Sequence, residues 1–519
     1  MTATTDHGKE RTDPLDMVVI GAGVNGAGIA RDAAGRGLSV LLCEKDDIAQ
    51  GTSSRSGKLV HGGLRYLEYY EFRLVREALK EREVLLENAP HIIWPMRFVL
   101  PHNRELRPAW MIRAGLFLYD HLGGRRRLPG SRGLKLRQCP EGEPLKEEYT
   151  KGFEYSDCWV DDSRLVIFNA LDAQRCGAEV LTRTTCENAE RRNDVWEVTL
   201  RQMNTGERRH VRARCVVNAA GPWVDRVLKS SLGYEGPDRV KLVKGSHIVV
   251  PKPYRGGQAY LLQNTDKRVI FVNPYEGDKL LIGTTDILYE GDPDRVAIEQ
   301  EEIDYLCGVV NRYFRTPISS KDVVSSFSGI RPLFDDKAEN PSAVTRDYVF
   351  DITDDNGEAP LLSVFGGKIT TYRRLAEHAL ERLAQYFPGM GSAWTDGRAL
   401  PGGDIPNADF DIYLDRLRDR FPVIPDVTLR RLGRAYGTIT ERILNGAERL
   451  DDLGHHFGVD LYERELRYLV EEEWAGTAED VLWRRTKLGL RFSAEETRAL
   501  GGWLQSNYGG VAAGDVRNG

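Results

Sequence analysis

The sequence predicts an α/β protein in three parts: a Rossmann-like domain, an inserted α+β domain with an antiparallel sheet, and an all-helical C-terminal domain. Three observations predict this fold class. A short apolar strand, a glycine-rich turn, a helix of small residues and a second strand follow one another over residues 16–44. Alternating and apolar runs that are typical of antiparallel strands occur at 240–250, 259–263, 268–273 and 279–283. From about residue 408 onward, the apolar residues keep helical spacing and strand signals are few.

The first unit, DMVVIGAGVNGAGIARDAAGRGLSVLLCE, has the pattern of a dinucleotide-binding βαβ fold. Gly21 permits the tight turn, Gly23 lets the backbone approach a pyrophosphate, and Gly26 lets the helix pack closely against the strands. The helix N-terminus then directs free N–H groups and its positive dipole end at the phosphates. Glu44 is spaced to bind a ribose hydroxyl. An acid there favours an unphosphorylated ribose, and therefore FAD or NAD over NADP.

Two later strand–glycine–helix junctions favour a flavin. The strand in CVVNAAGPW ends in Ala220 and Gly221, and the strand in SVFGGK ends in Gly366 and Gly367. Small residues let the backbone pass close to a flavin, and the second junction directs another helix dipole at the ring, where negative charge develops on reduction. The Gly- and Ser-rich loop at 50–57 suits a backbone that wraps a ligand. Three such junctions in this order predict an FAD-binding Rossmann-like domain.

Composition and charge exclude several classes of protein. The 519 residues are 41% hydrophobic and 29% charged, which is typical of a soluble globular protein of roughly two to four domains. The formal net charge of −6 gives no general reason to expect nucleic-acid binding. Seven scattered cysteines without a C-x-x-C pair indicate a reducing compartment, with neither disulfides nor a metal site. The sequence contains no recognisable signal peptide and no run of about 18 apolar residues, so a cytoplasmic protein is expected.

The order of elements predicts discontinuous domains. A flexible tail is expected at 1–13, and the FAD-binding domain at 14–93, 156–235 and 330–388. The substrate-binding domain is expected at 94–155 and 236–329, where 94–155 looks irregular and basic. A linker is expected at 389–407, followed by the helical domain at 408–519.

Further motifs run from about residue 16 to 385: KLVHGGLRYLEYYEFRLV, FEYSDCWVDDSRLV, VVNAAGPWVD, KGSHIVVP, IGTTD, SGIRPL, TRDY and FGGKITTYRRLAEHAL. With the first unit, they resemble the FAD-dependent, aerobic-type glycerol-3-phosphate dehydrogenases, within the D-amino-acid-oxidase-like flavoenzymes. The C-terminal AEDVLWRRTKLGL resembles the accessory helical domain of that family. The resemblance implies FAD as cofactor, and oxidation of sn-glycerol 3-phosphate to dihydroxyacetone phosphate by hydride transfer. It also implies that the electrons pass to a membrane quinone.

The candidate site residues follow from these motifs. Those expected to bind the cofactor are Gly21, Gly23, Asn25, Gly26, Glu44, Thr52, Ser53, Ser54, His61, Gly62, Ala220, Gly221, Gly366 and Gly367. The implied substrate is a dianionic phosphate ester, which requires Arg or Lys because the guanidinium fork matches phosphate oxygens. The expected substrate-binding residues are Arg65, Tyr66, Arg331, Arg346 and Lys368.

Oxidation of the alcohol also requires a proton acceptor with a pKa near the working pH, which favours histidine. His247, on a predicted strand, is the candidate base, and His61 is its competitor. Lys368, at a helix start, is a natural partner for the reduced flavin or for the developing alkoxide. With Arg331 these residues form the expected catalytic set. Their division of roles stays open, since an Arg or Lys that lowers the alcohol pKa, with water as the acceptor, fits equally well.

Residues 104–137 contain nine basic side chains and two acidic ones, interleaved with aromatic and aliphatic residues. This pattern favours a peripheral contact with an anionic membrane surface at the inner face of the cell membrane. The alternative is an ordinary helix with its apolar side in the core. Two other functions stay open: a soluble glycerophosphate oxidase that reduces oxygen to peroxide, and a flavin-binding scaffold without turnover. Homodimerisation is also left open.

Overall fold

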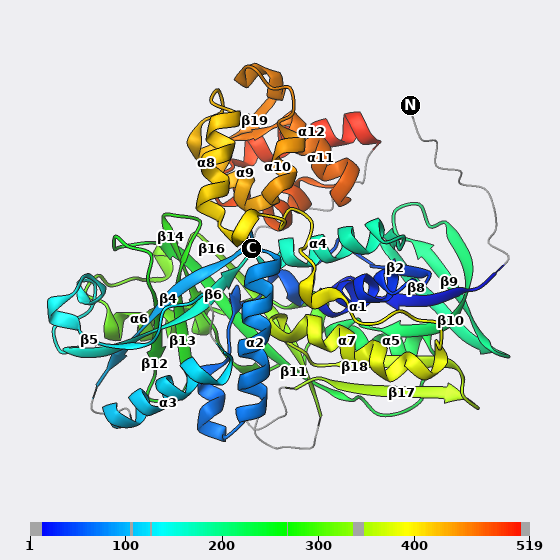
Figure 1. Ribbon diagram of the computed structural model, residues 1–519, viewed down its shortest axis with the longest axis horizontal. Coiled ribbons are helices and arrows are strands. Elements are labelled where there is room, and N and C mark those ends of the chain that lie inside the picture. The colour runs from blue at the N-terminus through cyan, green and yellow to red at the C-terminus, as the bar shows by residue number, and fades with distance from the viewer. Residues whose placement is uncertain (1–12, 104–106, 125–126, 267, 336–346, 510–519) are drawn as a thin grey trace.

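Two sheets and a helical domain make up the part of the chain that the computed structural model describes, residues 13–103, 107–124, 127–266, 268–335 and 347–509. The two sheets lie side by side, and the helical domain covers one end of them (Figure 1). The predicted fold class is confirmed.

The first sheet contains the glycine-rich βαβ unit. Its strands, in spatial order, are β17 (Val349–Asp355), β18 (Glu358–Phe365), β10 (Arg208–Asn218), β1 (Leu15–Ile20), β2 (Val40–Cys43) and β7 (Glu179–Leu181). The five strands from β18 to β7 pair in parallel, and β17 is antiparallel at the edge. Two further antiparallel strands, β8 (Thr184–Arg192) and β9 (Val195–Gln202), extend from β10. Because the carboxyl ends of parallel strands share one edge, the three glycine junctions meet at that edge.

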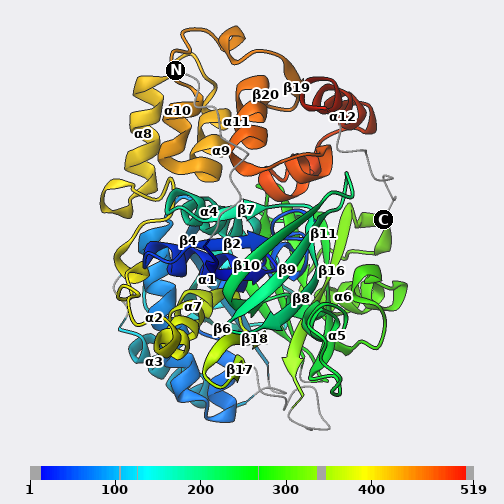
Figure 2. The same cartoon turned by 90° about the vertical axis from the view of Figure 1, so that its right-hand side faces the viewer.

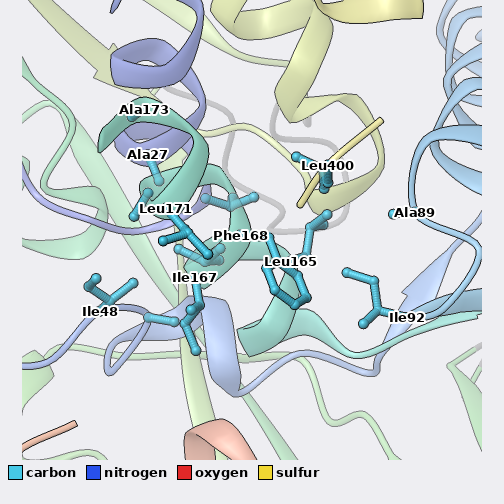
Figure 3. Close-up of a cluster of buried hydrophobic side chains, with 14 of the residues drawn as sticks. Ala27, Ile48, Ala89, Ile92, Leu165, Ile167, Phe168, Leu171, Ala173 and Leu400 are labelled. Carbon is cyan, nitrogen blue, oxygen red and sulfur yellow. The ribbon is translucent and has the colours of Figure 1, made fainter. Parts of the chain in front are cut away.

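Both faces of this sheet are buried. Three helices pack on one face: α1 (Val24–Gly35), α4 (Asp162–Arg175) and α7 (Tyr372–Leu383). Their small and aromatic side chains, such as Ala27 and Phe168, form a core with the sheet (Figure 3). The other face is covered by α5 (Val224–Ser231) and by β8 and β9. Burial on both faces explains why β2 and residues 17–20 of β1 are continuously apolar instead of alternating.

The second sheet is largely antiparallel, as expected. Its spatial order is β15 (Ile287–Leu288), β11 (Val240–Pro251), β14 (Lys279–Gly283), β13 (Val269–Tyr275), β12 (Ala259–Gln263), β4 (Ile93–His102), β6 (Lys151–Val160) and β3 (Leu59–Val60). Two more strands, β16 (Ser325–Phe334) and β5 (Arg132–Lys135), pair with β11 and β6. Helix α6 (Gln300–Tyr313) packs on one face, and α2 (Phe72–Asn88) and α3 (Ala109–Leu122) pack on the other.

The C-terminal domain packs on α4 (Figure 2) and contacts Ser163 and Arg164 in the first turn of that helix. It consists of α8 (Phe410–Arg420), α9 (Asp426–Tyr436), α10 (Thr440–Ile443), α11 (Glu463–Glu473), a π-helix at Asp480–Arg485, α12 (Ala494–Tyr508) and the short hairpin strands β19 (His456–Gly458) and β20 (Leu461–Tyr462). Its apolar side chains belong to the same buried cluster as α1 and α4. The completely buried pair of Arg164 on α4 and Glu473 on α11 lies at this junction.

One expectation differs from the structure. The stretch 94–155 is not irregular, since it contains most of β4, all of α3 and β5, and the start of β6. Pro95 and Pro101 conceal the strand signal of β4, because proline cannot donate to a ladder and is unusual between two neighbouring strands. The 389–407 segment lacks long elements but is anchored by buried Leu400 and Ile405. The expected tail at 1–13 lies outside the described residues, apart from Asp13.

Candidate functional site

A cavity of about 1340 Å³ lies between the two sheets. It exceeds the roughly 300–1,000 Å³ of an ordinary small-molecule pocket, which suits a dinucleotide together with a small substrate. Of the predicted site residues, those that line it are Gly21, Gly23, Asn25, Glu44, Thr52, Ser53, His61, Arg65, Tyr66, Ala220, Gly221, His247, Arg331, Gly366, Gly367 and Lys368. The fold therefore brings most of the predicted residues to one place.

The first glycine turn leaves no room for side chains on its strand side. Gly21 has a φ of +100°, which favours glycine, and a Cβ on Gly26 would lie 1.9 Å from the carbonyl oxygen of Gly21. A Cβ on Gly23 would meet only Ser53 Oγ, at 3.2 Å, on the cavity side. Gly26 therefore serves packing, whereas Gly23 keeps the cavity open above the N-terminus of α1.

Glu44 connects this turn to the following loop. Its Oε2 accepts a hydrogen bond from the Ala22 N–H at 2.8 Å, and its Oε1 accepts one from the Asp46 N–H at 3.0 Å. Burial raises the pKa of Glu44 to about 7, although these two N–H groups oppose the shift. The carboxylate lines the cavity with both oxygens held in place, so its remaining acceptor capacity faces a ligand.

Polar atoms without a protein partner show that the described residues fit a large polar ligand. Asn25 Nδ2 donates to the Gly366 carbonyl at 3.1 Å, but the buried Asn25 Oδ1 has no partner among the described residues. The buried Nε1 of Trp223 likewise finds no partner in the described part of the chain. A Cβ on Gly367, whose φ is +99°, would lie 2.8 Å from Asn25 Nδ2. The first and third glycine junctions therefore meet at Asn25, where a cofactor would find the unpartnered acceptor Oδ1 and glycine backbone without side chains.

Cationic and aromatic side chains gather farther along the cavity, beside Gly366 and Gly367. Lys368 Nζ lies 4.2 Å from the centre of the Tyr66 ring. Arg331, on β16, forms a short ion pair with Asp286 and contacts Thr284 Oγ1 at 3.4 Å. This end of the cavity combines fixed positive charge with hydrogen-bond donors, as a phosphate requires.

His247, on β11, is buried at the cavity wall, and its ring stacks on Phe327 with 5.0 Å between centres. Its Nδ1 has no partner among the described residues. Burial, together with Arg331 and Lys58, lowers the pKa of His247 to about 3, so the imidazole is neutral near pH 7. Burial also lowers the pKa of the competitor, His61. Both rings are thus neutral near pH 7.

Three predicted cofactor residues lie outside the cavity lining: Gly26, which is packed against the Gly21 carbonyl, Ser54 and Gly62. Ser54 donates its hydroxyl back to the Gly51 carbonyl at 3.4 Å, because the loop makes a tight 3₁₀ turn there. Gly62 is buried behind the wall, where its N–H donates to the Tyr119 hydroxyl at 2.8 Å. That these residues contact the cofactor stays a prediction. Arg346 lies outside the described residues.

Sequence reasoning missed the partners of the predicted residues. Asp286, which pairs with Arg331, belongs to the IGTTD motif, but nothing local signals its contact across the sheet. Lys58 was missed as well, although it forms a buried ion pair with Asp162 at 2.7 Å. Both pairs join segments far apart in the sequence.

Helix α3 presents an exposed apolar face beside the cavity mouth. Trp110 is 69% exposed and Phe117 is 60% exposed, and Tyr70 in the adjacent loop is 79% exposed. Leu116 and Tyr119, on the opposite side of α3, are buried in the core. The helix thus has one apolar side in the core and a second apolar stripe that is exposed.

The basic residues around α3 are partly engaged in the protein. Arg113 donates to Ser131 Oγ at 2.8 Å, and Arg127 donates to the Asn407 carbonyl at 2.6 Å. Arg104, Arg125 and Arg126 lie outside the described residues. Over the described ranges, no helix is long and apolar enough to cross a membrane, and no cluster of His, Cys, Asp or Glu could hold a metal ion.

Comparison with known proteins agrees with this geometry. Residues 16–373 match the model of a family described as FAD dependent oxidoreductase, and residues 393–502 match the C-terminal domain of alpha-glycerophosphate oxidase. The chain is 61% identical to D-erythritol 1-phosphate dehydrogenase of Brucella abortus, over 95% of this chain and 98% of that protein. It is 54% identical to aerobic glycerol-3-phosphate dehydrogenase of Escherichia coli, over 94% of this chain and 97% of that protein.

A solved structure shares the fold. The glycerol-3-phosphate dehydrogenase of Bacillus halodurans, determined in complex with FAD, superimposes with a TM-score of 0.75 at 29% identity, covering 95% of this chain and 94% of that chain.

Proposed function

Since the chain belongs to the FAD-dependent oxidoreductases of the glycerol-3-phosphate dehydrogenase family, we propose that it oxidises sn-glycerol 3-phosphate to dihydroxyacetone phosphate. FAD is the cofactor of this family of oxidoreductases. The observation that carries the substrate proposal is the group of Arg331, Lys368 and Tyr66 at the end of the cavity next to Gly366.

The residues at this end divide into a phosphate site and a proton acceptor. We assign Arg331 to the phosphate, because one of its nitrogens pairs with Asp286 while the guanidinium still lines the cavity. Arg65 and Lys368 add positive charge at the same wall. Tyr66 packs against Lys368 and orients its ammonium group.

His247 is the proposed base for the hydroxyl proton, and His61 is its alternative. With a pKa of about 3, His247 is a weak base in the ligand-free protein. A phosphate dianion bound to Arg331 would offset the guanidinium charge that helps to lower this pKa, and so bring it closer to the working range. When bound, FAD would supply the acceptor for the hydride of the carbinol carbon. The protein's own contribution is to neutralise the phosphate, receive the proton and exclude water.

We propose a membrane quinone as the electron acceptor, at the inner face of the cell membrane. The support is the apolar stripe of α3 with Tyr70, because Tyr70 and Met111 are exposed and also line the cavity. A surface of exposed aromatics flanked by basic side chains suits peripheral contact with anionic lipid. The alternative acceptor is oxygen, as in a soluble glycerophosphate oxidase.

Flavin absorbance tests both the proposed reaction and the proposed electron acceptor. Anaerobic addition of glycerol 3-phosphate should bleach the flavin, and a fully yellow enzyme at high substrate concentration would refute the proposed reaction. Stopped-flow reoxidation of the bleached enzyme should be fast with a soluble quinone and slow with air. The reverse order would favour the oxidase.

D-erythritol 1-phosphate is a second candidate substrate, because one relative is 61% identical to this chain and bears that name. Both compounds are polyol phosphates, so the same cationic site suits either. The ratio of kcat/KM for the two substrates decides between them, since specificity is a difference in transition-state binding. A ratio above about tenfold in favour of erythritol phosphate would reassign the physiological substrate.

A further inference from the structure

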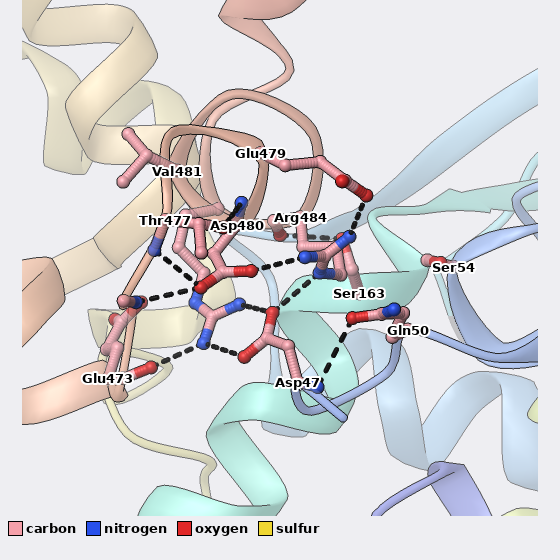
Figure 4. A network of polar contacts seen from close by, with 12 residues as sticks. Asp47, Gln50, Ser54, Ser163, Glu473, Thr477, Glu479, Asp480, Val481 and Arg484 are labelled. Carbon is pink, nitrogen blue, oxygen red and sulfur yellow. Dashed lines mark hydrogen bonds and ion pairs between the residues drawn. The ribbon is translucent and has the colours of Figure 1, made fainter. Parts of the chain in front are cut away.

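The segment 44–53 faces the cavity with most of its residues, but Asp47 faces away. Glu44, Asp46, Ala49 and Ser53 are among the residues that line the cavity, whereas Asp47 is buried on the opposite side of the segment. Its carboxylate contacts the π-helix of the C-terminal domain (Figure 4). Asp47 therefore joins the segment 44–53, called the cradle below, to the C-terminal domain.

Two neighbouring arginines of the π-helix hold this carboxylate. Arg484 Nε donates to Asp47 Oδ2 at 2.6 Å. Arg485 binds in a bidentate manner, with Nη2 donating to Asp47 Oδ1 at 2.8 Å and Nη1 forming a short bond to Oδ2. The side chains of Asp47 and Arg485 are completely buried. A buried bidentate pair with this geometry fixes both the position and the orientation of the carboxylate.

The cradle segment transmits this hold to the glycine turn. The Ala49 N–H donates to the Ala22 carbonyl at 3.1 Å, and Ser53 Oγ accepts from the Val24 N–H at 3.0 Å. Two residues from Asp47, Ala49 has a φ of +65°, a conformation that costs energy for any residue with a Cβ. Surrounding contacts must hold such a residue in place.

The π-helix is itself anchored firmly. Asp480 accepts hydrogen bonds from the backbone N–H groups of Gly476 and Thr477 at 2.8 and 2.9 Å, and forms short ion pairs with Arg484 and Arg183. Arg183 in turn lies beside the cradle, since its N–H donates to the Asp46 carbonyl at 2.8 Å. π-helices are rare and occur frequently at functional sites. This one places two consecutive arginines on one carboxylate.

We infer that Arg484 and Arg485 are positioning residues for FAD, which act through Asp47 to keep the segment 44–53 in its cofactor-binding shape. The C-terminal domain thereby contributes to cofactor retention without contacting the cavity at this point. By linkage, FAD binding stabilises the contact between the π-helix and Asp47 to the same extent.

The rate of FAD release from the holoenzyme tests the inference, measured as the rise in free-flavin fluorescence after dilution. Arg485→Lys keeps the charge and removes the fork, and should release FAD at least tenfold faster. The matched control is Arg431→Lys. Arg431 makes an equally elaborate set of contacts, to Asp460 and Glu465, but only within the C-terminal domain. The control should release FAD within twofold of the parent rate. Parent-like release from Arg485→Lys, or equal acceleration by the control, would overturn the inference.

The double variant separates positioning from general destabilisation. If Arg485 acts through Asp47, Asp47→Asn combined with Arg485→Lys should release FAD no more than about twofold faster than the faster single variant. Rates that multiply would show independent effects and contradict the inference.

A measurement on the parent protein needs no variant to fold. Hydrogen exchange is compared between full chains with and without FAD. FAD should slow exchange at residues 480–487 more than at α9 in the same domain, because the π-helix binds Asp47 of the segment 44–53 directly. Equal protection of both segments would mean that FAD acts only on global stability, and would overturn the inference.

Discussion

The guanidinium of Arg331 pairs with Asp286 and also lines the cavity. The carboxylate of Asp286 holds one nitrogen in a short ion pair, and Thr284 Oγ1 lies 3.4 Å from another. The remaining donor capacity faces the cavity, where a phosphate would bind. The Asp286 carboxylate thus holds the Arg331 guanidinium in place, but it also neutralises part of the positive charge that would bind the phosphate.

Replacing Arg331 with Lys should lower kcat/KM for glycerol 3-phosphate about 10- to 100-fold, because a hydrogen bond to a charged group contributes about 1.5–3 kcal/mol. FAD content, measured by visible absorbance, should stay normal. A loss in KM alone indicates ground-state binding of the phosphate, and a simultaneous loss in kcat indicates orientation of the reacting carbon. Arg295→Lys, at an exposed position of the same sheet domain, is the control. Wild-type kinetics in the Arg331 variant would assign this residue a structural role.

His91, away from the cavity, is a second buried histidine whose pKa is lowered, like that of His247. Its two ring nitrogens are buried without a partner among the described residues, and it packs on Phe168. Burial, together with Arg164 and Arg434, lowers its pKa to about 3. Because the folded pKa lies below the unfolded value near 6.5, the unfolded chain binds the proton first. Stability is therefore lost as the pH falls from about 6.5 toward 3.

The variant His91→Leu has no group to protonate at this position, so it should not share the parent's loss of stability at low pH. Relative to the parent, its free energy of unfolding should gain about 2 kcal/mol between pH 8 and pH 5. Thermal melting at the two pH values measures the change. A variant-to-parent difference that does not depend on pH would contradict the assigned pKa.

At the scale of elements, the turn from β1 into α1 separates packing from binding. A Cβ on Gly26 would collide with the Gly21 carbonyl at 1.9 Å, whereas a Cβ on Gly23 meets only Ser53 Oγ on the cavity side. Two glycines of one motif are therefore required for different reasons.

Gly23→Val should abolish flavin retention with little change in far-UV circular dichroism, because its methyl groups project into the cavity. Gly26→Ala should instead disrupt folding, since its methyl group meets backbone that cannot move aside. Flavin absorbance per chain and circular dichroism distinguish the two. Normal flavin content in Gly23→Val would contradict the assignment of this turn to the cofactor.

At the scale of the whole molecule, the helical domain and α3 lie at opposite ends of the two sheets (Figure 1), and the cavity is lined by residues from both sheets. The C-terminal domain shares a buried core with α1 and α4, so it is continuous with the cofactor domain. The exposed stripe of α3 lies by the cavity mouth. A membrane contact there would bring the electron acceptor to the site.

Replacing Trp110 and Phe117 with Ser should weaken binding to anionic vesicles by about 3 kcal/mol or more, because burial of a large apolar side chain contributes about 1.5–3 kcal/mol. Dye-linked turnover should survive. Ile412→Ser with Val427→Ser removes exposed apolar area from the C-terminal domain and is the control. Cosedimentation measures binding, and equal losses in the two double variants would place the membrane surface elsewhere.

The sequence by itself determined the parts of this protein whose signal is local. The spacing of Gly21, Gly23 and Gly26 and of the later glycine pairs specified the fold class and the cofactor, because each junction needs only a strand, a turn and a helix N-terminus. The family motifs contributed the cationic residues that line the cavity.

Only the tertiary structure decided what depends on pairing between distant segments. No local pattern predicts that Asp286 binds Arg331, 45 positions away. Likewise, none predicts that Asp47 binds Arg484 and Arg485, 437 and 438 positions away. The sequence pattern did not predict the strand β4, because its prolines disfavour a strand locally. Pairing with β6 and β12 nevertheless stabilises it. Such contacts form when the sheets and domains assemble, so their energies are absent from any short stretch of the sequence.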